Sequence, residues 1–346
     1  MMTVLSVAYP LAPVGGDAVG GAEQVLARLD HELVTRGHRS IVLACEGSQT
    51  AGTLIRAPLP PPPFDDGAIA RAHQAQRTVI EAVQRSTRID LVHMHGVYFF
   101  RALPERGVPV LATLHLPPSW YPGEVFSPAR ERTYLNCVSR SQFDACPDHR
   151  AIVATIPNGV DAVSRPPHAR RNFCLAMGRI CEEKGFHLAI DAAVAADMPL
   201  LIAGRVYPYE AHRRYFDAAI APRLSKRVRF LGAVAGARKR RLLAAARCVL
   251  IPSLVAETSS LVAMEALACG TPVIAFRSGA LPEIVEHGRS GFVVDSPQQM
   301  AEAIRTVGAI DHEVCRDAAR DRFDAGRMAA EYLKLYERLI EKRGQV

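Results

Sequence analysis

Several signatures that would assign this chain to a familiar class are missing from its 346 residues. It contains no run of 18 apolar residues, so no membrane-spanning helix is predicted. The 8 cysteines form no C-x-x-C pair, and none stands at zinc-finger spacing from a histidine. This pattern indicates reduced thiols in a cytosolic core rather than a zinc site or a disulfide framework.

The composition excludes non-globular classes. Hydrophobic residues make up 49% and charged residues 22% of the chain, which excludes a disordered tail, a collagen-like repeat and a coiled coil. The formal net charge of +7 suits an anionic partner, which could be nucleic acid, acidic lipid or a phosphorylated small molecule. The N-terminal segment lacks basic residues and is interrupted by Pro10 and Pro13, so it predicts a first strand rather than a signal peptide.

The hydrophobic pattern predicts two α/β domains. Short apolar stretches alternate with amphipathic ones along the whole chain, as in units of parallel strands joined by helices. Strands are predicted at 4–8, 41–44, 91–93, 108–114, 136–139 and 152–156, then at 173–177, 200–203, 228–231, 248–251, 272–275 and 292–294. Two doubly wound parallel sheets in tandem leave a cleft between them, and ligands bind such sheets outside the carboxyl ends of the strands.

The domain limits follow from the segments between these patterns. We expect an N-terminal domain over 1–164 and a second domain over 165–325, with the polar, proline-bearing stretch 163–171 as the linker. The proline run 58–63 predicts an extended loop. A long amphipathic helix at 327–343, within a closing segment 326–346, is expected to cross back and pack on the first domain.

A glycine-rich loop follows the first predicted strand. Residues 14–24 read VGGDAVGGAEQ, so Gly20 and Gly21 stand directly before a predicted helix at about 22–35. Glycine allows close approach of the backbone to a ligand, and a helix N-terminus attracts a phosphate. The spacing is not G-x-G-x-x-G, so a dinucleotide fingerprint is not indicated. The loop is either a phosphate cradle or a tight strand–helix turn.

Two cations follow the first strand of the second domain. Arg179 and Lys184 lie in MGRICEEKGF, residues 177–186, at the carboxyl end of that strand. A planar guanidinium and an ammonium at this edge can neutralise a diphosphate. The alternative is a solvated turn in which Glu182 and Glu183 pair with them.

Two carboxylates mark the stretch 251–275, IPSLVAETSSLVAMEALACGTPVIA. A strand ends near Ile251, and Ser259 or Ser260 is a suitable N-cap for a helix to about residue 268. Glu257 precedes this helix and Glu265 lies in its second turn. The pair could act as general acid and base or accept hydrogen bonds from sugar hydroxyls, or the two could be a capping acid and an exposed helix acid.

Histidines and one basic run complete the candidates. His93 and His95 alternate on one face of a strand and could bind a metal, but no third ligand is evident nearby. His115 follows a strand and could orient a substrate, move a proton or be purely structural. The run RKRR at 238–241 resembles a patch for nucleic acid or membrane, and its helical context favours a solvated face.

Together these segments resemble the retaining glycosyltransferases of family 4 (GT4), which have the GT-B architecture of two facing Rossmann-like domains. The matching stretches are GGAE (20–23), IPNGVD (156–161), GRICEEKG (178–185), residues 251–275 and SGALPEIVEHGRSGFVV (278–294). The resemblance covers nearly the whole chain and is strongest over 173–295. It departs from the family at Ser259 and Ser260, where serines stand in place of the phenylalanine and glycine of E-x-F-G-L, and at AGRVYP (203–208).

The resemblance implies a role for each candidate. Arg179 and Lys184 would hold the diphosphate of a nucleotide-sugar donor, with Gly20 and Gly21 close to the donor or the acceptor. Glu257 would bind the donor sugar and Glu265 the ribose. The amides of Ser260 and Leu261 would meet the distal phosphate or the sugar, and His115 would lie near the reacting sugar. The aromatic loop 116–126, which contains the only tryptophan, is a candidate acceptor wall.

The predicted function is metal-independent transfer of a sugar from a UDP- or GDP-sugar. The chain has no Asp-x-Asp to hold a metal on the diphosphate, whereas it offers two cations and a helix start, so no cofactor is expected. The acceptor is a glycan, a lipid or a small molecule, and no nucleic acid is expected. The protein is expected in the cytoplasm, with peripheral membrane contact left open. The alternatives are a sugar-nucleotide hydrolase or epimerase, and a non-catalytic binder.

Overall fold

The computed structural model describes residues 1–346 except 19, 58–64, 164–170 and 342–346. The chain forms two compact units, of which unit 1 comprises residues 1–159 and 325–346 and unit 2 comprises residues 160–324. The divisions therefore fall after residues 159 and 324, whereas the sequence analysis placed them after 164 and 325. Val160 belongs to unit 2 because its N–H donates to the Phe323 carbonyl at 2.7 Å. The proline run 58–63 and nearly all of the linker 163–171 lie outside the described residues.

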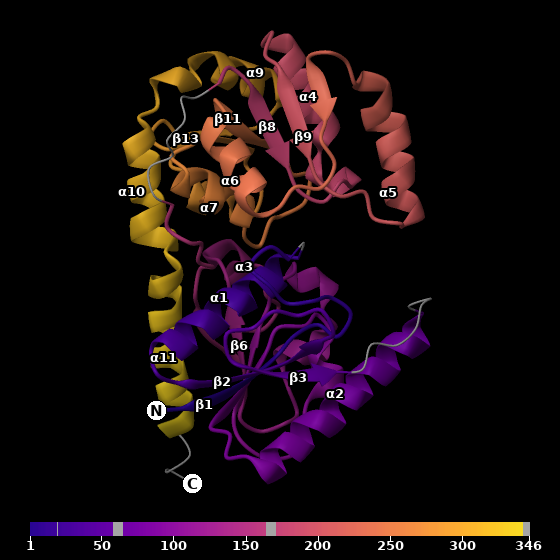
Figure 1. The fold of residues 1–346 in the computed structure, drawn as a ribbon, viewed down its shortest axis with the longest axis vertical. Helices are drawn as coiled ribbons and strands as arrows, with labels where there is room; N and C mark the ends of the chain where they lie inside the picture. Colours follow the sequence, from indigo (N-terminus) through magenta and orange to yellow (C-terminus); the bar gives the residue numbers. More distant parts are fainter. Residues whose placement is uncertain (19, 58–64, 164–170, 342–346) are drawn as a thin grey trace. The chain divides into compact units, whose positions relative to one another are not determined.

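Unit 1 is built on a seven-stranded parallel sheet (Figure 1). Its strands are β1 (Thr3–Val7), β2 (Arg39–Cys45), β3 (Thr53–Ala57), β4 (Leu91–Met94), β5 (Val110–Thr113), β6 (Thr133–Cys137) and β7 (Ile152–Thr155), in the order β3-β2-β1-β4-β5-β6-β7. Its helices are α1 (Gly21–Thr35), α2 (Asp66–Ser86), α3 (Arg140–Asp144) and α11 (Ala325–Glu341). The six strands predicted here are all present.

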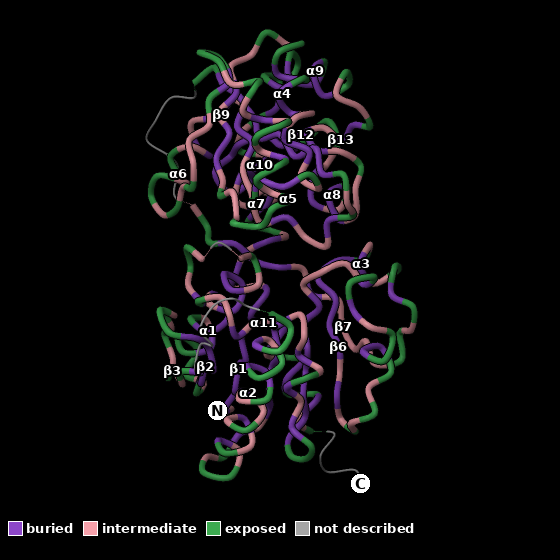
Figure 2. The backbone as a smooth tube through the Cα atoms, turned by 90° about the vertical axis from the view of Figure 1, so that its right-hand side faces the viewer, coloured by how far each residue is buried: buried purple, intermediate pink, exposed green. Residues whose placement is uncertain are grey.

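Most elements of unit 1 that were predicted from the sequence have a well-buried apolar face. Strand β1 is buried along its whole length, and α1 buries Val25, Leu26, Leu29 and Leu33 on the predicted face. Figure 2 shows these strands buried and the connecting loops exposed. Strand β3 was not predicted because it is an edge strand with only Ala57 buried, so its hydrophobic pattern is weak. Helix α2 was also missed, and its N-cap is Asp65, whose side chain accepts from the Ala68 N–H.

Unit 2 is built on a six-stranded parallel sheet. Its strands are β8 (Cys174–Met177), β9 (Leu200–Ala203), β10 (Val228–Phe230), β11 (Cys248–Ile251), β12 (Val273–Phe276) and β13 (Gly291–Val294), in the order β10-β9-β8-β11-β12-β13. Its helices are α4 (Phe186–Ala195), α5 (Glu210–Tyr215), α6 (Gly236–Ala245), α7 (Leu261–Ala268), α8 (Leu281–Ile284), α9 (Pro297–Thr306) and α10 (His312–Phe323). All six predicted strands are present, within one or two residues at their ends.

Both sheets have the Rossmann strand order, which fixes where a ligand can bind. In unit 1 the chain adds strands from β1 toward one edge of the sheet and then from β4 toward the other edge. In unit 2 it does the same from β8 and then from β11. The loops after β8 and β11 therefore diverge at the carboxyl edge of the unit 2 sheet, and this topological switch point is the usual ligand site of an open parallel sheet. The loops after β1 and β4 do the same in unit 1.

Helix α11 is part of unit 1. It contacts α1, beside which it lies in Figure 1, and it buries Met328, Tyr332, Tyr336 and Leu339. The Tyr336 hydroxyl lies 2.7 Å from His93 Nδ1 on β4, so the last helix is bonded to the central part of the sheet. The helix begins at Ala325 and ends at Glu341, compared with the predicted limits of 327 and 343.

Candidate active site

Two loops of unit 2 are held together at the switch point. The loop after β8 contains the short turn Glu182–Lys184, and the loop after β11 runs from Pro252 to Ser260. The Leu254 N–H donates to the Glu183 carbonyl at 2.8 Å, which ties the two loops. Gly185 has a φ of +62°, and a Cβ there would lie 2.1 Å from the Pro252 carbonyl oxygen. Only glycine allows this approach, so the position of Lys184 depends on it.

Lys184 and Glu257 form an ion pair across these loops. The Lys184 ammonium lies 2.5 Å from Glu257 Oε1, and Ser253 donates a second hydrogen bond to the same oxygen. The Glu257 side chain is 9% exposed, whereas that of Lys184 is 29% exposed. The carboxylate is therefore fixed by two donors, and the ammonium keeps two further N–H groups for a ligand. The Glu182 and Glu183 carboxylates are not its partners, in contrast to the solvated-turn alternative.

Arg179 is exposed immediately beyond the carboxyl end of β8. Its positive charge acts on three neighbours, Cys181, Glu183 and His212, and after burial it is the next cause that lowers the pKa of His212. Burial is the largest effect on Cys181 and raises the pKa of its thiol to about 11. Arg179 and Lys184 thus flank one short loop, and both side chains are accessible to solvent.

Helix α7 presents its N-terminus at the same edge of the sheet. Ser260 is the N-cap, as predicted, and its Oγ accepts from the Ala263 N–H at 3.4 Å. The helix begins at Leu261, whose backbone N–H is in the first turn and has no partner within the helix. Gly279, at φ +56°, allows the next loop to pack against the backbone of Glu257, since a Cβ would lie 2.2 Å from the Glu257 carbonyl oxygen.

Glu265 is paired within unit 2. The Lys239 ammonium on α6 lies 2.6 Å from Glu265 Oε2, and the two side chains are 15% and 13% exposed. The basic run 238–241 was interpreted as a solvated face, and that is wrong for Lys239, because α6 turns this side chain toward α7. Arg238, Arg240 and Arg241 are exposed as expected.

The glycine-rich loop of unit 1 forms the entry to α1. Gly20 is the N-cap residue with an extended backbone, and Gly21 is the exposed first residue of the helix. Glu23 in the first turn is buried, and burial raises the pKa of its carboxyl group. A Cβ at Gly20 would lie 1.8 Å from Glu23 Oε2. The sequence analysis did not single out Glu23. The motif GGAE nevertheless places an acidic residue in the first turn of a helix, shortly after two glycines.

His115 belongs to a cluster of three histidines in unit 1. Its Nε2 lies 3.1 Å from His95 Nδ1, and the two rings are stacked at 5.4 Å. Burial lowers the pKa of His115 to about 4, so the ring is neutral near pH 7. The two ring nitrogens of His93 contact Tyr336 and Thr113, at 2.7 and 2.8 Å. His93 is thus committed to hydrogen bonds, which argues against the H-x-H metal alternative.

The loop 116–126 is only partly exposed. The Tyr121 hydroxyl accepts from the backbone N–H groups of His115 and Leu116, at 3.1 and 3.3 Å, and Phe126 is fully buried. Trp120 is 48% exposed and is the large hydrophobic side chain of this loop that a ligand can reach. Tyr121 therefore fixes the backbone that carries His115, a role that sequence reasoning did not find.

The predicted site residues fall into two groups. Unit 2 brings together Arg179, Lys184, Glu257, Ser260 and Leu261 around the switch point, with Glu265 one helix turn further along α7. Unit 1 holds Gly20, Gly21 and His115 at the carboxyl ends of its own strands.

Two family models match most of the chain. The model described as Glycosyltransferase Family 4 matches residues 19–163, and the one described as Glycosyl transferases group 1 matches residues 171–309. The chain belongs to glycosyltransferase family 4. The predicted family, the GT-B fold of two Rossmann-like parallel-sheet domains and the class of enzyme are thereby confirmed. The enzyme is a glycosyltransferase.

Named relatives span nearly the full length of this glycosyltransferase. It is 27% identical, over 89% of each chain, to the GDP-mannose-dependent alpha-(1-6)-phosphatidylinositol dimannoside mannosyltransferase of Mycobacterium tuberculosis. It is 26% identical to the phosphatidyl-myo-inositol mannosyltransferase of Mycobacterium leprae, over 97% of this chain and 98% of that one.

Solved structures also match the glycosyltransferase over nearly its full length. AviGT4, a glycosyltransferase involved in avilamycin A biosynthesis, superposes with a TM-score of 0.74 at 25% identity, over 99% of this chain and 98% of that one. Anabaena Alr3699/HepE in complex with UDP-glucose gives a TM-score of 0.75 at 21% identity, over 97% and 100%, and shares the fold.

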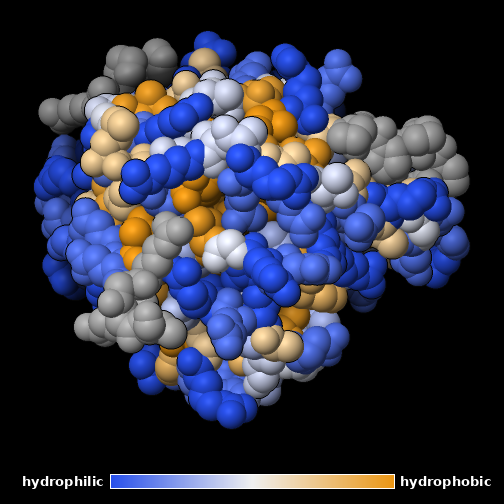
Figure 3. Space-filling view, turned by 90° about the horizontal axis from the view of Figure 1, so that it is seen from below, coloured by the Kyte–Doolittle hydropathy of each residue, from blue (hydrophilic) through white to orange (hydrophobic). Residues whose placement is uncertain are grey.

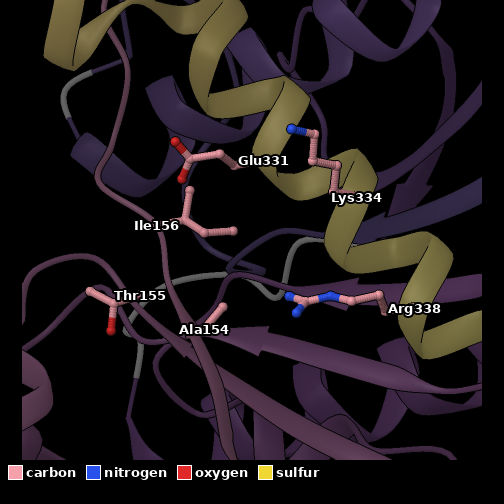
Figure 4. A pocket seen from close by; sticks show the side chains of 6 residues that line it. All are labelled: Ala154, Thr155, Ile156, Glu331, Lys334 and Arg338. Atoms are coloured by element: carbon pink, nitrogen blue, oxygen red, sulfur yellow. The ribbon is translucent and has the colours of Figure 1, made fainter.

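A pocket of about 360 Å³ lies elsewhere in unit 1 of the glycosyltransferase (Figure 4). It is lined by Ala154, Thr155, Ile156, Glu331, Lys334 and Arg338. None of these was predicted as a site residue, and β7 and α11 supply most of the lining. Two cations, Lys334 and Arg338, line it together with one carboxylate, Glu331.

The surface bears on the question of membrane contact. No helix in the described part of the glycosyltransferase is long and apolar enough to cross a membrane. The large hydrophobic side chains that are exposed, among them Trp120, Val194, Tyr209 and Leu254, belong to separate elements. Figure 3 shows one face, where hydrophobic residues appear in small groups among hydrophilic ones. Peripheral membrane contact remains a prediction.

Proposed function

We propose that the enzyme transfers a hexose from a UDP- or GDP-sugar to an acceptor hydroxyl with retention of anomeric configuration, and that no metal ion assists departure of the diphosphate. The observation that carries this proposal is the Lys184–Glu257 pair, which sets a cation and a buried carboxylate side by side at the switch point of unit 2. An ammonium suits a diphosphate, and a carboxylate suits the hydroxyls of the sugar joined to it.

The charge that develops on the leaving group explains why two cations are placed there. As the bond between the anomeric carbon and the phosphate oxygen breaks, negative charge accumulates on the nucleoside diphosphate. Arg179, Lys184 and the N–H groups at the start of α7 supply fixed positive charge for it, without reorganisation during the reaction. The chain contains no Asp-x-Asp, so these groups take the place of the usual metal bridge.

Retention follows from a same-face reaction. The acceptor oxygen bonds to the anomeric carbon on the side that the diphosphate leaves, and the departing phosphate oxygen takes the acceptor proton. This step needs no protein nucleophile, so Glu257 binds sugar hydroxyls and does not attack. Glu265 receives the ribose hydroxyls while Lys239 keeps its carboxylate in place. His115 and the loop with Trp120 serve the acceptor side.

A donor panel tests the proposal. The mycobacterial relative is named as GDP-mannose-dependent, so GDP-mannose is compared with UDP-glucose, and release of the nucleoside diphosphate is measured with an acceptor panel of polyols and glycans. We expect one donor to be consumed only when an acceptor is present, with equal rates in EDTA and in Mg²⁺. A product of inverted configuration, measured by NMR, would refute retention. Donor consumption without an acceptor would favour a hydrolase or an epimerase.

A further inference from the structure

Three potential metal ligands meet beside the loop that carries Arg179 and Lys184. Cys181, Glu183 and His212 each offer one ligand atom, and these atoms lie within 4.8 Å of one another. Cys181 directly precedes the turn Glu182–Lys184 after β8 and Glu183 lies within it, whereas His212 comes from α5, which follows the next strand along the chain. The sequence analysis found no zinc spacing because it compared neighbours along the chain, whereas the sheet brings these three residues together.

The burial and hydrogen bonding of this cluster, which we call the CEH cluster, favour a ligand. The Cys181 side chain is fully buried, and Glu183 and His212 are half-buried. The Nδ1 atom of His212 is buried and has no hydrogen-bond partner in the described part of the chain. The His212 ring stands edge-on to Tyr209, at 5.2 Å, and to Tyr207, at 6.2 Å, so its orientation is fixed.

The chemical types of the three ligand atoms determine which metal ion the cluster prefers. A thiolate and an imidazole are preferred by Zn²⁺ and similar borderline ions, whereas Mg²⁺ and Ca²⁺ need shells of oxygen ligands. Around Zn²⁺ the bonds are about 2.0 to 2.3 Å long and tetrahedral, so ligand atoms stand roughly 3.5 Å apart. Small rotations of the side chains suffice to reach that spacing. Three protein ligands leave a fourth position for water.

The cluster can also be satisfied without an ion, but less completely. In that state the Cys181 thiol donates to the Arg179 backbone carbonyl at 3.5 Å. This arrangement leaves the buried Nδ1 of His212 unsatisfied, and a buried polar atom without a partner is unfavourable. Binding of a divalent cation releases the thiol proton to water, and the resulting thiolate and the Glu183 carboxylate together balance the double positive charge of the ion.

We propose that the CEH cluster binds one Zn²⁺-class divalent cation, which joins the loop carrying Arg179 and Lys184 to helix α5. The ion is structural with respect to sugar transfer, because its ligands differ from the groups assigned to the diphosphate. The assignment rests on the three side chains alone and is independent of the proposed function.

Cobalt substitution tests the site directly on the full chain. Co²⁺ is titrated into the metal-free protein, and the thiolate-to-cobalt charge-transfer band is followed by absorption, with Zn²⁺ as the competitor. We expect one equivalent of Co²⁺, a band that Zn²⁺ abolishes, and affinity reduced about 100-fold or more in Cys181→Ser and in His212→Gln. Cys269→Ser, another buried thiol of unit 2, is the matched control and should leave the band unchanged.

Each outcome has a definite meaning. Circular dichroism identifies variants that fail to fold, and having two ligand variants keeps the test valid if one of them does. A band that persists in both folded ligand variants, or no band with the wild-type chain, would overturn the proposal. If EDTA slows transfer by the wild-type enzyme but not by Cys181→Ser, the effect is due to removal of the ion from the CEH cluster. Sensitivity that persists in this variant instead contradicts metal-independent departure of the diphosphate.

Discussion

At the scale of single residues, unit 2 holds its acids with cations before any substrate arrives. Glu257 is paired with Lys184 and Glu265 with Lys239, and all four side chains are at least two-thirds buried. A buried carboxylate without its cation would be strongly unfavourable. The pairs therefore hold both carboxylates in place as hydrogen-bond acceptors for hydroxyl groups, and the Lys184 ammonium is already positioned when the diphosphate of the donor binds.

Replacement of Lys184 tests this arrangement. In Lys184→Ala, one fixed charge is lost from the departing diphosphate and Glu257 loses its ion-pair partner. We expect a loss of about 2–4 kcal/mol of transition-state stabilisation, which is a fall in kcat/KM of roughly 30- to 1,000-fold. Steady-state release of the nucleoside diphosphate measures it. Lys226→Ala, an exposed lysine of the same unit, is the control, and equal rates for the two variants would contradict the role of Lys184.

At the scale of elements, the last helix completes the core of unit 1. The Tyr332 hydroxyl on α11 lies 3.0 Å from Thr113 Oγ1 on β5 and accepts from Asn136 Nδ2 on β6, also at 3.0 Å. Tyr336 makes the corresponding contact with His93. These hydroxyls satisfy polar side chains inside the sheet that no water reaches, so α11 contributes hydrogen bonds as well as apolar area.

Removal of one hydroxyl should destabilise unit 1 measurably. In Tyr332→Phe, the buried amide of Asn136 loses its acceptor, which costs about 1–3 kcal/mol of unfolding free energy. Urea denaturation followed by the fluorescence of Trp120, the only tryptophan, measures it in unit 1. Glu337→Gln, exposed on the same helix, is the control. Equal midpoints for the wild type and Tyr332→Phe would refute the role of the hydroxyl.

At the scale of the whole molecule, the two units differ in their buried histidines. Unit 1 contains three, His73, His93 and His95, together with the half-buried His115, and burial lowers the pKa of all four below 6.5. In unit 2 the histidines with a lowered pKa, His187 and His212, are only half-buried. Acidification therefore acts mainly on unit 1.

The sign of this effect follows from the unfolded chain. Above pH 6.5 the histidines are neutral in both states, so they add no pH dependence. Below 6.5 the unfolded chain takes up protons, whereas folded His73 and His115 stay neutral until about pH 4. The unfolding free energy of unit 1 should therefore fall between pH 6.5 and 4, by about 2 kcal/mol for each of these two histidines at pH 5.

Denaturation at several pH values, followed by Trp120 fluorescence, measures the loss. His73→Gln should make the pH dependence shallower by the share of one histidine. His31→Gln, which changes an exposed residue of α1, should leave it unchanged. A Trp120 transition that does not shift to lower denaturant between pH 7 and 5 would contradict the assignment.

The sequence by itself determined the elements and the kind of chemistry. All predicted strands are present because they are short and apolar and most of them are buried, and Ser260 caps α7 because capping is a local interaction. Arg179, Lys184 and Glu257 were found because loops after parallel strands must reach one edge of the sheet.

Only the tertiary structure decided which residues form ion pairs and hydrogen bonds with one another. The contacts of Lys239 with Glu265, of Tyr332 with Asn136 and of Tyr121 with the backbone of His115 join residues by packing rather than by sequence spacing. The same holds for the CEH cluster, whose histidine lies on α5, beyond β9 in the chain. Periodicity reports which face of an element is buried, whereas the partner on that face depends on how strands are ordered in the sheet.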